Sequence, residues 1–286
     1  MLDLHIHTTF SDGSDTVSSI LKKAQELNLE AISITDHETV DAYFEIKKME
    51  NIYKGTIIKG VELKAYYIDK TIDILGYNID VDIMNSYLKK IYNKDNFEKV
   101  QLKKFNYIYD ICMKYNLKLD SKNDIINRLK GNYATFILYN EIKKYEENKY
   151  KLPSDIWISQ STFSKKYIGN KDSDFYYDSK DDYLGLKDIL DIIHNSGGLA
   201  FLAHLFVYSN IIDKTSYLKD IFKNYAIDGL ECYYKQFSKE QINCLLKFAK
   251  ENNKYICGGS DYHGLNKPNI LLGVDYPLEV LKYWHK

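Results

Sequence analysis

The sequence predicts an α/β barrel into which a helical subdomain is inserted. Short apolar segments alternate with segments of helical periodicity over residues 1–80 and again over residues 183–286. Lysine-rich and asparagine-rich helical stretches replace this alternation over residues 81–182. Polar residues of metal-binding type follow several apolar segments, at the strand ends where α/β barrels carry their active sites. We therefore expect a barrel domain that holds the site and an insertion that caps the substrate.

The first eighty residues alternate between predicted strands and helices. The opening strand covers residues 3–7, and Asp15 or Thr16 then caps a helix over residues 17–27, whose apolar positions follow helical spacing. A second helix is predicted over residues 39–49. The three further strands are predicted over residues 31–35, 56–61 and 72–77.

The alternation returns after the insertion. A helix over residues 186–196 ends at Gly197 and Gly198, which suits a helix C-terminus. The tail over residues 267–286 is expected to pack back across the barrel. Strands are predicted over residues 199–203, 228–234 and 255–259, and helices over residues 217–225 and 239–251.

Helices dominate the predicted insertion. Apolar spacing between Val100 and Tyr115 predicts one helix, and two more are expected over residues 121–129 and 134–144. A polar loop rich in Asp and Ser is predicted over residues 167–182. We interpret the aromatic residues here as the core of the subdomain rather than as a platform for stacking nucleic-acid bases.

The charges of the chain argue against a broad nucleic-acid interface. The 286 residues carry a formal net charge of −1, although a local basic groove stays open. Arg128 is the single arginine, so a guanidinium clamp on phosphate is available at one position at most. We interpret Arg128 as a surface helix residue.

Cysteine usage and hydropathy indicate a cytoplasmic protein. The four cysteines have no paired spacing, which fits reduced thiols. Apolar runs fall short of the ~20 residues that a membrane span needs, and the N-terminus lacks the pattern of a signal segment. We expect no membrane partner, and the oligomeric state stays open.

His5 and His7 together predict half of a metal site. Side chains alternate between the faces of a strand, so both imidazoles leave the same face. A polar turn containing Asp12 follows and can bring a carboxylate back over the strand end. Two imidazoles and a carboxylate suit Zn, Mn or Fe better than Ca or Mg. Taken alone, the pair could equally be two solvated residues on an edge strand, so the interpretation depends on partners farther along the chain.

Such partners recur at the ends of the other predicted strands. Five of the seven histidines fall at these positions, while His194 and His285 are interpreted as solvated. The set exceeds the three protein ligands of a typical catalytic zinc. Two or three ions that share a carboxylate would account for it, and ions ~3.5–4 Å apart are a recurrent device for phosphoester hydrolysis. The set is His5, His7, Asp12, Asp36, His37, Glu62, Asp73, His204, Asp261 and His263.

Five runs lie at the strand ends in this order: HIHTTFSDG, ITDHE, GVEL, LAHL and GGSDYHG. They resemble the motifs of the polymerase-and-histidinol-phosphatase (PHP) family of metal-dependent phosphoesterases, and DGLECYY and KPNILLG extend the likeness over essentially the whole chain. With its helical insertion, the chain is most similar to the branch of nucleotide and nucleoside-bisphosphate phosphatases and 5′-to-3′ exoribonucleases. The resemblance implies a distorted (β/α)7 TIM-like barrel and a site for two or three divalent ions, usually Mn, Zn or Fe.

Carried over residue by residue, the resemblance implies three metal positions that share Glu62 as a bridge. It gives Glu62, His204 and Asp261 the catalytic role. Asp36 also matches and is expected to hydrogen-bond a neighbouring histidine. The first ion would be bound by His5, His7, Glu62 and Asp261, the second by Glu62 and His204, and the third by Asp12, His37 and His263.

The chain departs from the family's pattern at three places. Asp73 stands where relatives commonly have a histidine, and we expect it to bind metal through a carboxylate instead. Relatives often have Arg-Pro-His before a helix of the insertion, where this chain has Tyr133 and Thr135. In relatives, a helix of the insertion often carries arginines towards the substrate. In this chain Lys103 and Lys104 lie near that position instead. These four residues of the insertion are the expected substrate contacts, and a solvated helix face is the alternative for the two lysines.

The expected function is hydrolysis of a phosphomonoester by attack of a metal-bound hydroxide. The expected substrate is a small phosphorylated molecule, a nucleotide or nucleoside bisphosphate. A 5′-to-3′ exonuclease acting on a short oligonucleotide is the first alternative. A metal-binding module without activity is the second, and its signs would be the altered residue Asp73 and the missing arginines.

Overall fold

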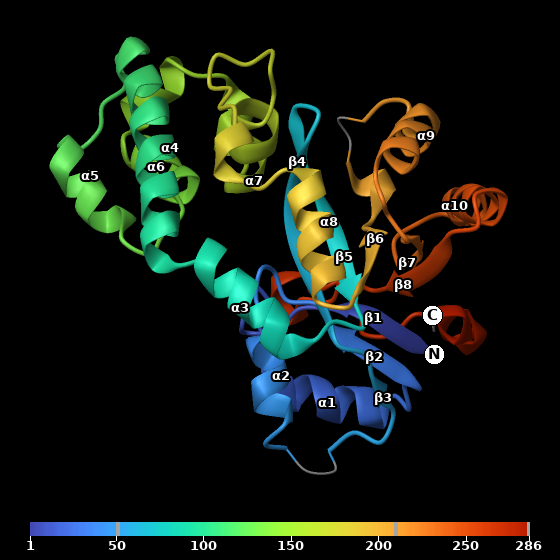
Figure 1. The fold of residues 1–286 in the computed structure, drawn as a ribbon. Coiled ribbons are helices and arrows are strands. Elements are labelled where there is room, and N and C mark those ends of the chain that lie inside the picture. Colours follow the sequence, from blue (N-terminus) through green and yellow to red (C-terminus); the bar gives the residue numbers. More distant parts are fainter. Residues whose placement is uncertain (50–51, 209–210, 285–286) are drawn as a thin grey trace. The chain divides into compact units, whose positions relative to one another are not determined.

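The computed structural model describes residues 1–49, 52–208 and 211–284. The chain divides into two compact units. The first is formed by Met1–Lys89 with Tyr183–Lys286, and the second by Lys90–Asp182. The first unit contains strands and helices, whereas the described elements of the second are helical (Figure 1). The predicted α/β class is therefore confirmed.

The first unit begins with a parallel sheet of β1 (Leu2–Ile6), β2 (Ala31–Ile34) and β3 (Thr56–Ile57). Between the strands lie α1 (Val17–Glu26) and α2 (Asp41–Ile46). Of the two expected caps of α1, Thr16 is the one observed, because its side chain accepts a hydrogen bond from the backbone of Ser19. The predicted second helix is real but shorter than expected, and Val40 at its N-terminus makes no side-chain cap.

The second sheet has the order β4 (Gly60–Tyr67), β5 (Lys70–Tyr77), β6 (Leu199–Leu202), β7 (Gly229–Tyr234) and β8 (Tyr255–Gly259). The β5 strand runs antiparallel to both of its neighbours, and the last three strands are parallel. Figure 1 shows the long hairpin of β4 and β5.

This hairpin corrects the predicted strand over residues 56–61. The structure divides that segment between β3 and the start of β4, so Glu62 lies inside a strand rather than beyond its end. Ile68 and Asp69 form the two-residue turn with φ values of 40° and 68°, the left-handed conformation that a tight hairpin turn requires. The Ile-Asp pair carries no glycine or asparagine, so it gave no sequence signal for a turn.

The two sheets meet at single bridges rather than continuous ladders. The backbone amide of Asp261 donates to the carbonyl of His5 at 2.9 Å, and that of Glu38 donates to the carbonyl of Glu62 at 2.9 Å. Gly259 permits the first approach, because a Cβ there would lie 2.3 Å from the Cβ of His5. The described strands form no closed sheet, so the seven-stranded barrel stays a prediction.

Three helices and the tail complete the first unit. They are α8 (Leu186–Asn195), α9 (Lys214–Asn224) and α10 (Lys239–Glu251), and the bounds of α10 are those predicted. The α9 helix begins earlier than expected because Asp213 caps it. The short helices η5 (Leu205–Val207) and η6 (Gly264–Asn266) follow β6 and β8. The tail does pack back: Val274 pairs with Leu2, and Trp284 of η7 (Leu278–Trp284) joins the core beside Phe201.

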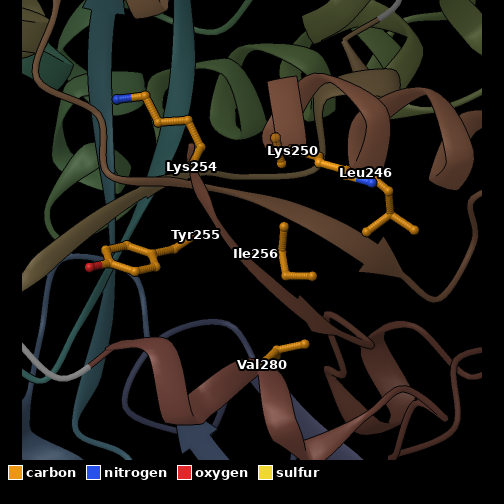
Figure 2. A pocket seen from close by; sticks show the side chains of 7 residues that line it. Leu246, Lys250, Lys254, Tyr255, Ile256 and Val280 are labelled. Atoms are coloured by element: carbon orange, nitrogen blue, oxygen red, sulfur yellow. The ribbon is translucent and has the colours of Figure 1, made fainter. Parts of the chain in front are cut away.

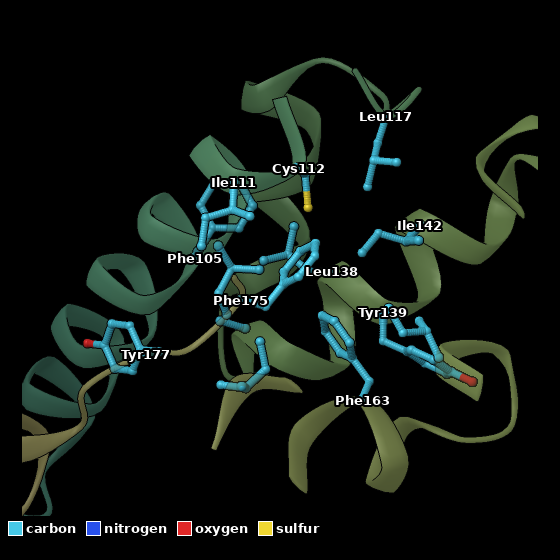
Figure 3. Packing of buried hydrophobic residues seen from close by; sticks show 14 of the residues in the cluster. Phe105, Ile111, Cys112, Leu117, Leu138, Tyr139, Ile142, Phe163, Phe175 and Tyr177 are labelled. Carbon is cyan, nitrogen blue, oxygen red and sulfur yellow. The ribbon is translucent and has the colours of Figure 1, made fainter. Parts of the chain in front are cut away.

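The second unit is built around its own apolar core (Figure 3). Phe105, Leu138 and Phe163 are fully buried there, which confirms the interpretation of the aromatic residues as core. The α3 helix (Val81–Ile91) leads in from the first unit. The elements that follow are α4 (Lys94–Lys114), α5 (Lys122–Leu129), α6 (Ala134–Lys144), η1 (Glu146–Tyr150), η2 (Ser154–Trp157), α7 (Gln160–Thr162), η3 (Phe163–Ile168) and η4 (Lys180–Asp182).

Arg128 joins two helices of the second unit. One Nη2 atom donates to Glu141 at 2.7 Å and to Asp120 at 3.0 Å. Glu141 is buried and also accepts from the backbone amide of Asp120 at 2.6 Å. The single guanidinium is therefore committed to a structural network.

Every helix in the described ranges is too short or too polar to span a bilayer. The four cysteines are free, and Cys244 alone among them is exposed. The cytoplasmic compartment stays a prediction.

Asp3 links β1 to two segments near the other end of the chain. Its carboxylate is fully buried and accepts from the backbone and the hydroxyl of Ser260, at 2.9 and 2.5 Å, and from the amide of Gly273 at 2.7 Å. Burial raises the pKa of Asp3, and the hydrogen bonds oppose that rise. The three donors would be buried without an acceptor if the carboxylate were removed.

We predict that Asp3→Ala lowers the free energy of unfolding of the first unit by about 3 kcal/mol, because each buried unsatisfied donor costs about 1–3 kcal/mol. The chain has two tryptophans, Trp157 in the second unit and Trp284 in the first. Urea titration in a Trp157→Phe background therefore follows Trp284 fluorescence alone. The exposed Asp275 provides the control, since Asp275→Ala should change stability by less than about 0.5 kcal/mol. Equal effects of the two substitutions would refute the structural role of Asp3.

Candidate metal centre

The side chains of His5 and His7 point to the same side at the carboxyl end of β1, and both are fully buried. Their ring centroids lie 5.2 Å apart. The Nε2 atom of each ring is buried and has no hydrogen-bond partner. Two buried, unpartnered imidazole nitrogens that face carboxylates are what a metal ion would satisfy, so the donors present fit a divalent ion. The alternative of two solvated residues on an edge strand is wrong.

Glu62 lies at the middle of the cluster. Its Oε2 atom is 3.3 Å from Nε2 of His5, 3.2 Å from Nε2 of His7 and 3.2 Å from Nδ1 of His37. Its Oε1 atom is 3.1 Å from Nε2 of His204. The β4 strand holds this side chain with 1% of its surface exposed. One carboxylate thus faces two different sets of imidazoles through its two oxygens.

The remaining predicted donors surround this centre. Oδ1 of Asp261 lies 3.4 Å from Nε2 of His7. His263 follows on the same loop, and its Nε2 lies 3.1 Å from Oδ1 of Asp12. The other oxygen of Asp12 is 3.8 Å from Nε2 of His37. Asp12 is 58% exposed and is thus the member of the set most open to solvent.

The donor atoms form three overlapping groups, each with members within 4.8 Å of one another. The overlap fits more than one divalent ion. His5 and His7 each belong to two groups, which the sequence did not predict. The groups are His7, Asp12, His37 and His263; His5, His7 and Asp261; and His5, Glu62 and His204.

Asp73 lies beside these groups but belongs to none of them. Its Oδ2 atom is 3.9 Å from Nε2 of His204 and accepts from the hydroxyl of Tyr208 at 3.3 Å. Its Oδ1 atom is 3.7 Å from Nζ of Lys64. A role for Asp73 as a metal ligand therefore stays a prediction.

Glu231 orients two of the imidazole residues and was not predicted. It is buried on β7, and its Oε1 atom lies 2.8 Å from Nδ1 of His5. Its Oε2 atom accepts from the backbone amide of His204 at 2.8 Å. A carboxylate at Nδ1 favours the tautomer of His5 that leaves Nε2 free to bind metal. The one signal in the sequence was an acidic residue within the apolar run DGLECYY.

Asp36 acts on the turn after β1 rather than on a histidine directly. Its carboxylate accepts from the backbone and hydroxyl of Thr8, both at 2.7 Å, and from the hydroxyl of Ser11 at 2.6 Å. The same hydroxyl of Ser11 lies 3.4 Å from Nδ1 of His7. The expected direct bond to a histidine is therefore wrong, because Thr8 and Ser11 occupy the carboxylate.

Two site residues have left-handed backbone conformations. The φ values are 23° for His204 and 58° for Asp261. Such conformations are uncommon outside glycine and concentrate at functional sites. Asp261 is held further by Lys267 and Tyr234, which contact its Oδ2 at 2.6 and 2.9 Å. Its Oδ1 is left to face the imidazoles.

The charges of the cluster stabilise one another. Burial would lower the pKa of His7, but its contacts with Asp261 and Glu62 raise that pKa to about 9. Burial would raise the pKa of Glu62, but the charges of His37 and His5 hold it well below its ordinary value. The pKa of Asp261 is likewise lowered by His5 and His7 against the effect of burial. The site therefore keeps ionised carboxylates, the form that binds metal ions.

The predicted substrate contacts all lie in the second unit. Nζ of Lys103 is 3.5 Å from Asp182, and Nζ of Lys104 is 3.3 Å from the same carboxylate. Tyr133 precedes α6, is 65% exposed and contacts Phe97 edge-to-face. Thr135 lies in the first turn of α6 and is partly exposed. The two lysines therefore form ion pairs within the insertion and are not simply solvated residues on a helix face.

Two histidines lie outside the predicted donor set, and both were interpreted as solvated. Nε2 of His194 lies 2.8 Å from a carboxylate oxygen of Asp228, so a hydrogen bond holds it. His285 lies outside the described residues.

A cavity of about 370 Å³ lies between α10, β8 and η7 (Figure 2). It is lined mainly by apolar side chains such as Leu246, Ile256 and Val280. None of its lining residues belongs to the three donor groups.

Curated relatives cover almost the whole chain. A phosphoribosyl 1,2-cyclic phosphate 1,2-diphosphodiesterase of Eggerthella lenta is 23% identical over 272 residues, which cover 92% of this chain and 94% of the relative. The 5′-3′ exoribonuclease Rnm of Escherichia coli is 26% identical over 272 residues, which cover 91% of this chain and 84% of the relative. Both names describe hydrolases of phosphate ester bonds, which confirms the enzyme class predicted from the sequence.

Solved structures show the same fold. A protein of Bifidobacterium adolescentis assigned as a metal-dependent phosphoesterase aligns over 99% of this chain and 94% of its own, with a TM-score of 0.68 and 20% identity. An amidohydrolase of Chromobacterium violaceum aligns over 98% and 92%, with a TM-score of 0.69 and 19% identity. At sequence level, a model of the PHP domain matches residues 3–256. The chain therefore belongs to the PHP domain family.

Proposed function

We propose that this chain is a metal-dependent phosphoesterase that removes phosphate from a nucleotide or nucleoside bisphosphate. The observation that carries the proposal is the position of Glu62, whose two oxygens face separate imidazoles at 3.1–3.3 Å. A carboxylate shared between donor sets is the arrangement that places two ions close together, and such pairs serve phosphoester hydrolysis.

The proposed metal ligands are the donors of the three groups, and the proposed ions are two or three of Mn, Zn or Fe. Such ions, when bound, supply water of lowered pKa and neutralise charge on the phosphate oxygens. The distorted (β/α)7 barrel is the fold that we propose to carry the site. The ligands are His5, His7, Asp12, His37, Glu62, His204, Asp261 and His263.

The chain's own residues fix the geometry of this centre. Glu62 is the proposed bridge, and His204 and Asp261 flank it from the ends of β6 and β8. Glu231 fixes the tautomer of His5, and Lys267 directs one oxygen of Asp261 away from the centre. These contacts keep the donors in place without a substrate, so little reorganisation is needed when one binds.

The helical unit is proposed as the cap that holds the substrate. Lys103, Lys104, Tyr133 and Thr135 stay its proposed contacts. Lys104 would have to exchange its ion pair with Asp182 for a phosphate, and Lys103 would have to exchange those with Asp181 and Asp182. Lysine binds phosphate as a point charge, so such an exchange needs no fixed geometry.

A 5′-to-3′ exonuclease is the second candidate, and one observation favours it. Both curated relatives are named for cleavage of phosphodiesters, one of them for the 5′-3′ degradation of RNA. The metal centre suits either reaction, since both need an activated water and charge neutralisation at phosphorus. The two candidates therefore differ in their substrate and not in the chemistry at phosphorus.

We predict that Glu62→Gln reduces the turnover of an aryl phosphate with added Mn by about 100-fold or more, since even groups that only orient metal ligands cost 10- to 100-fold. The metal content per chain, measured by plasma emission spectroscopy, should fall with it, while the circular dichroism spectrum stays unchanged. Glu26→Gln, on the exposed face of α1, is the matched control and should behave as the wild type. Full activity of Glu62→Gln would exclude the bridging role.

We further predict that the metal-loaded protein releases inorganic phosphate from nucleoside monophosphates and bisphosphates and leaves a 5′-phosphorylated RNA pentanucleotide intact. Phosphate is measured by colorimetry and the nucleotides by chromatography. The same pentanucleotide with a 5′-hydroxyl is the control for an internal nuclease. Stepwise release of nucleoside monophosphates from the 5′ end would instead establish the exonuclease. A protein that binds Mn but cleaves neither class nor the aryl phosphate would be a binding module.

A further inference from the structure

Lys64 lies on the same face of β4 as Glu62, since the two are separated by one residue. In the antiparallel ladder it is paired directly with Asp73 of β5. Nζ of Lys64 lies 3.7 Å from Oδ1 of Asp73. The hairpin thus places an ammonium group two residues along β4 from the central carboxylate of the metal centre.

Asp73 is held in position by Tyr208. The backbone amide of Asp73 donates to the tyrosine oxygen at 2.7 Å, and the hydroxyl donates to Oδ2 of Asp73 at 3.3 Å. Oδ1 is buried and has no hydrogen-bond partner. Lys64 is the cation that faces this oxygen, so the pair is aligned by the strand register and fixed by the tyrosine.

The positive charge of Lys64 also compensates for the negative charge of Asp73. Asp73 adds a carboxylate beside His204, whose Nε2 also faces Glu62. A phosphate carries up to two negative charges and would be repelled by this addition. The Lys64 ammonium compensates for it. Its side chain is about one-third exposed, and its three N–H donors exceed what one carboxylate oxygen can accept.

We propose that Lys64 binds a phosphate oxygen of the substrate and that Asp73 directs its ammonium group toward the metal centre. The pair supplies a fixed positive charge beside the metal centre, since Asp73 belongs to none of the three donor groups. The inference rests on the proposed phosphoesterase function, because it assigns a group that binds the phosphate in that site.

The test measures binding of inorganic phosphate to the Mn-loaded protein by calorimetry, without turnover. Lys64→Met keeps the apolar stem and should weaken phosphate binding by about tenfold or more, as expected for the loss of one charged hydrogen bond. Lys64→Arg should bind within about threefold of the wild type, because the charge is retained. Lys59→Met, the same change at an exposed lysine just before β4, should have no effect.

Metal content separates this role from that of a ligand. Lys64→Met and Asp73→Asn should both retain the metal-to-protein ratio of the wild type, measured by plasma emission spectroscopy. Loss of an ion in Asp73→Asn would make Asp73 a ligand and overturn the proposal. Unchanged phosphate affinity in Lys64→Met, or the lack of phosphate binding in the wild type, would also overturn it. A protein that binds phosphate through Lys64 but hydrolyses no phosphoester would refute the proposed function alone.

Discussion

The first unit depends on burying charged groups only in matched sets. A buried carboxylate without partners costs several kcal/mol, and removing one partner of a buried pair is strongly destabilising. Glu62 meets this requirement through four imidazoles, and Glu231 through an imidazole and a backbone amide. Asp3 on β1 meets it through donors of His5, Ser260 and Gly273. Each set joins strands that are far apart in the sequence, so the metal centre and the fold are stabilised by the same contacts.

Much of the donor set could be predicted because it follows from strand geometry. Residues two apart on a strand share a face, and the ends of parallel strands meet at one edge, which was enough to group His5, His7, His204 and Asp261. The groups that orient them could not be predicted. Glu231 is a single acidic residue in an apolar strand, and its partner His5 is 226 residues away. Nothing local distinguishes such a residue from one that faces solvent.

The errors in the predicted strands have local physical causes. The hairpin of β4 and β5 turns at Ile68 and Asp69, a pair without the usual turn residues, so the hairpin was not predicted. The error affected function as well as fold. The antiparallel register is what pairs Lys64 with Asp73, and a parallel arrangement with a helix between the strands would give no reason to connect them.

The network around Asp3 has a consequence for how the molecule is assembled. Its partners Ser260 and Gly273 lie 257 and 270 residues farther along the chain. The second unit contains its whole core within residues 90–182 and can form from near neighbours while the chain is still being synthesised. The first strand must wait for almost the last segment before its buried charge is neutralised. The histidines of the candidate metal centre that lie on β1 thus acquire their geometry late in folding, which makes completion of the fold a precondition for assembling the centre.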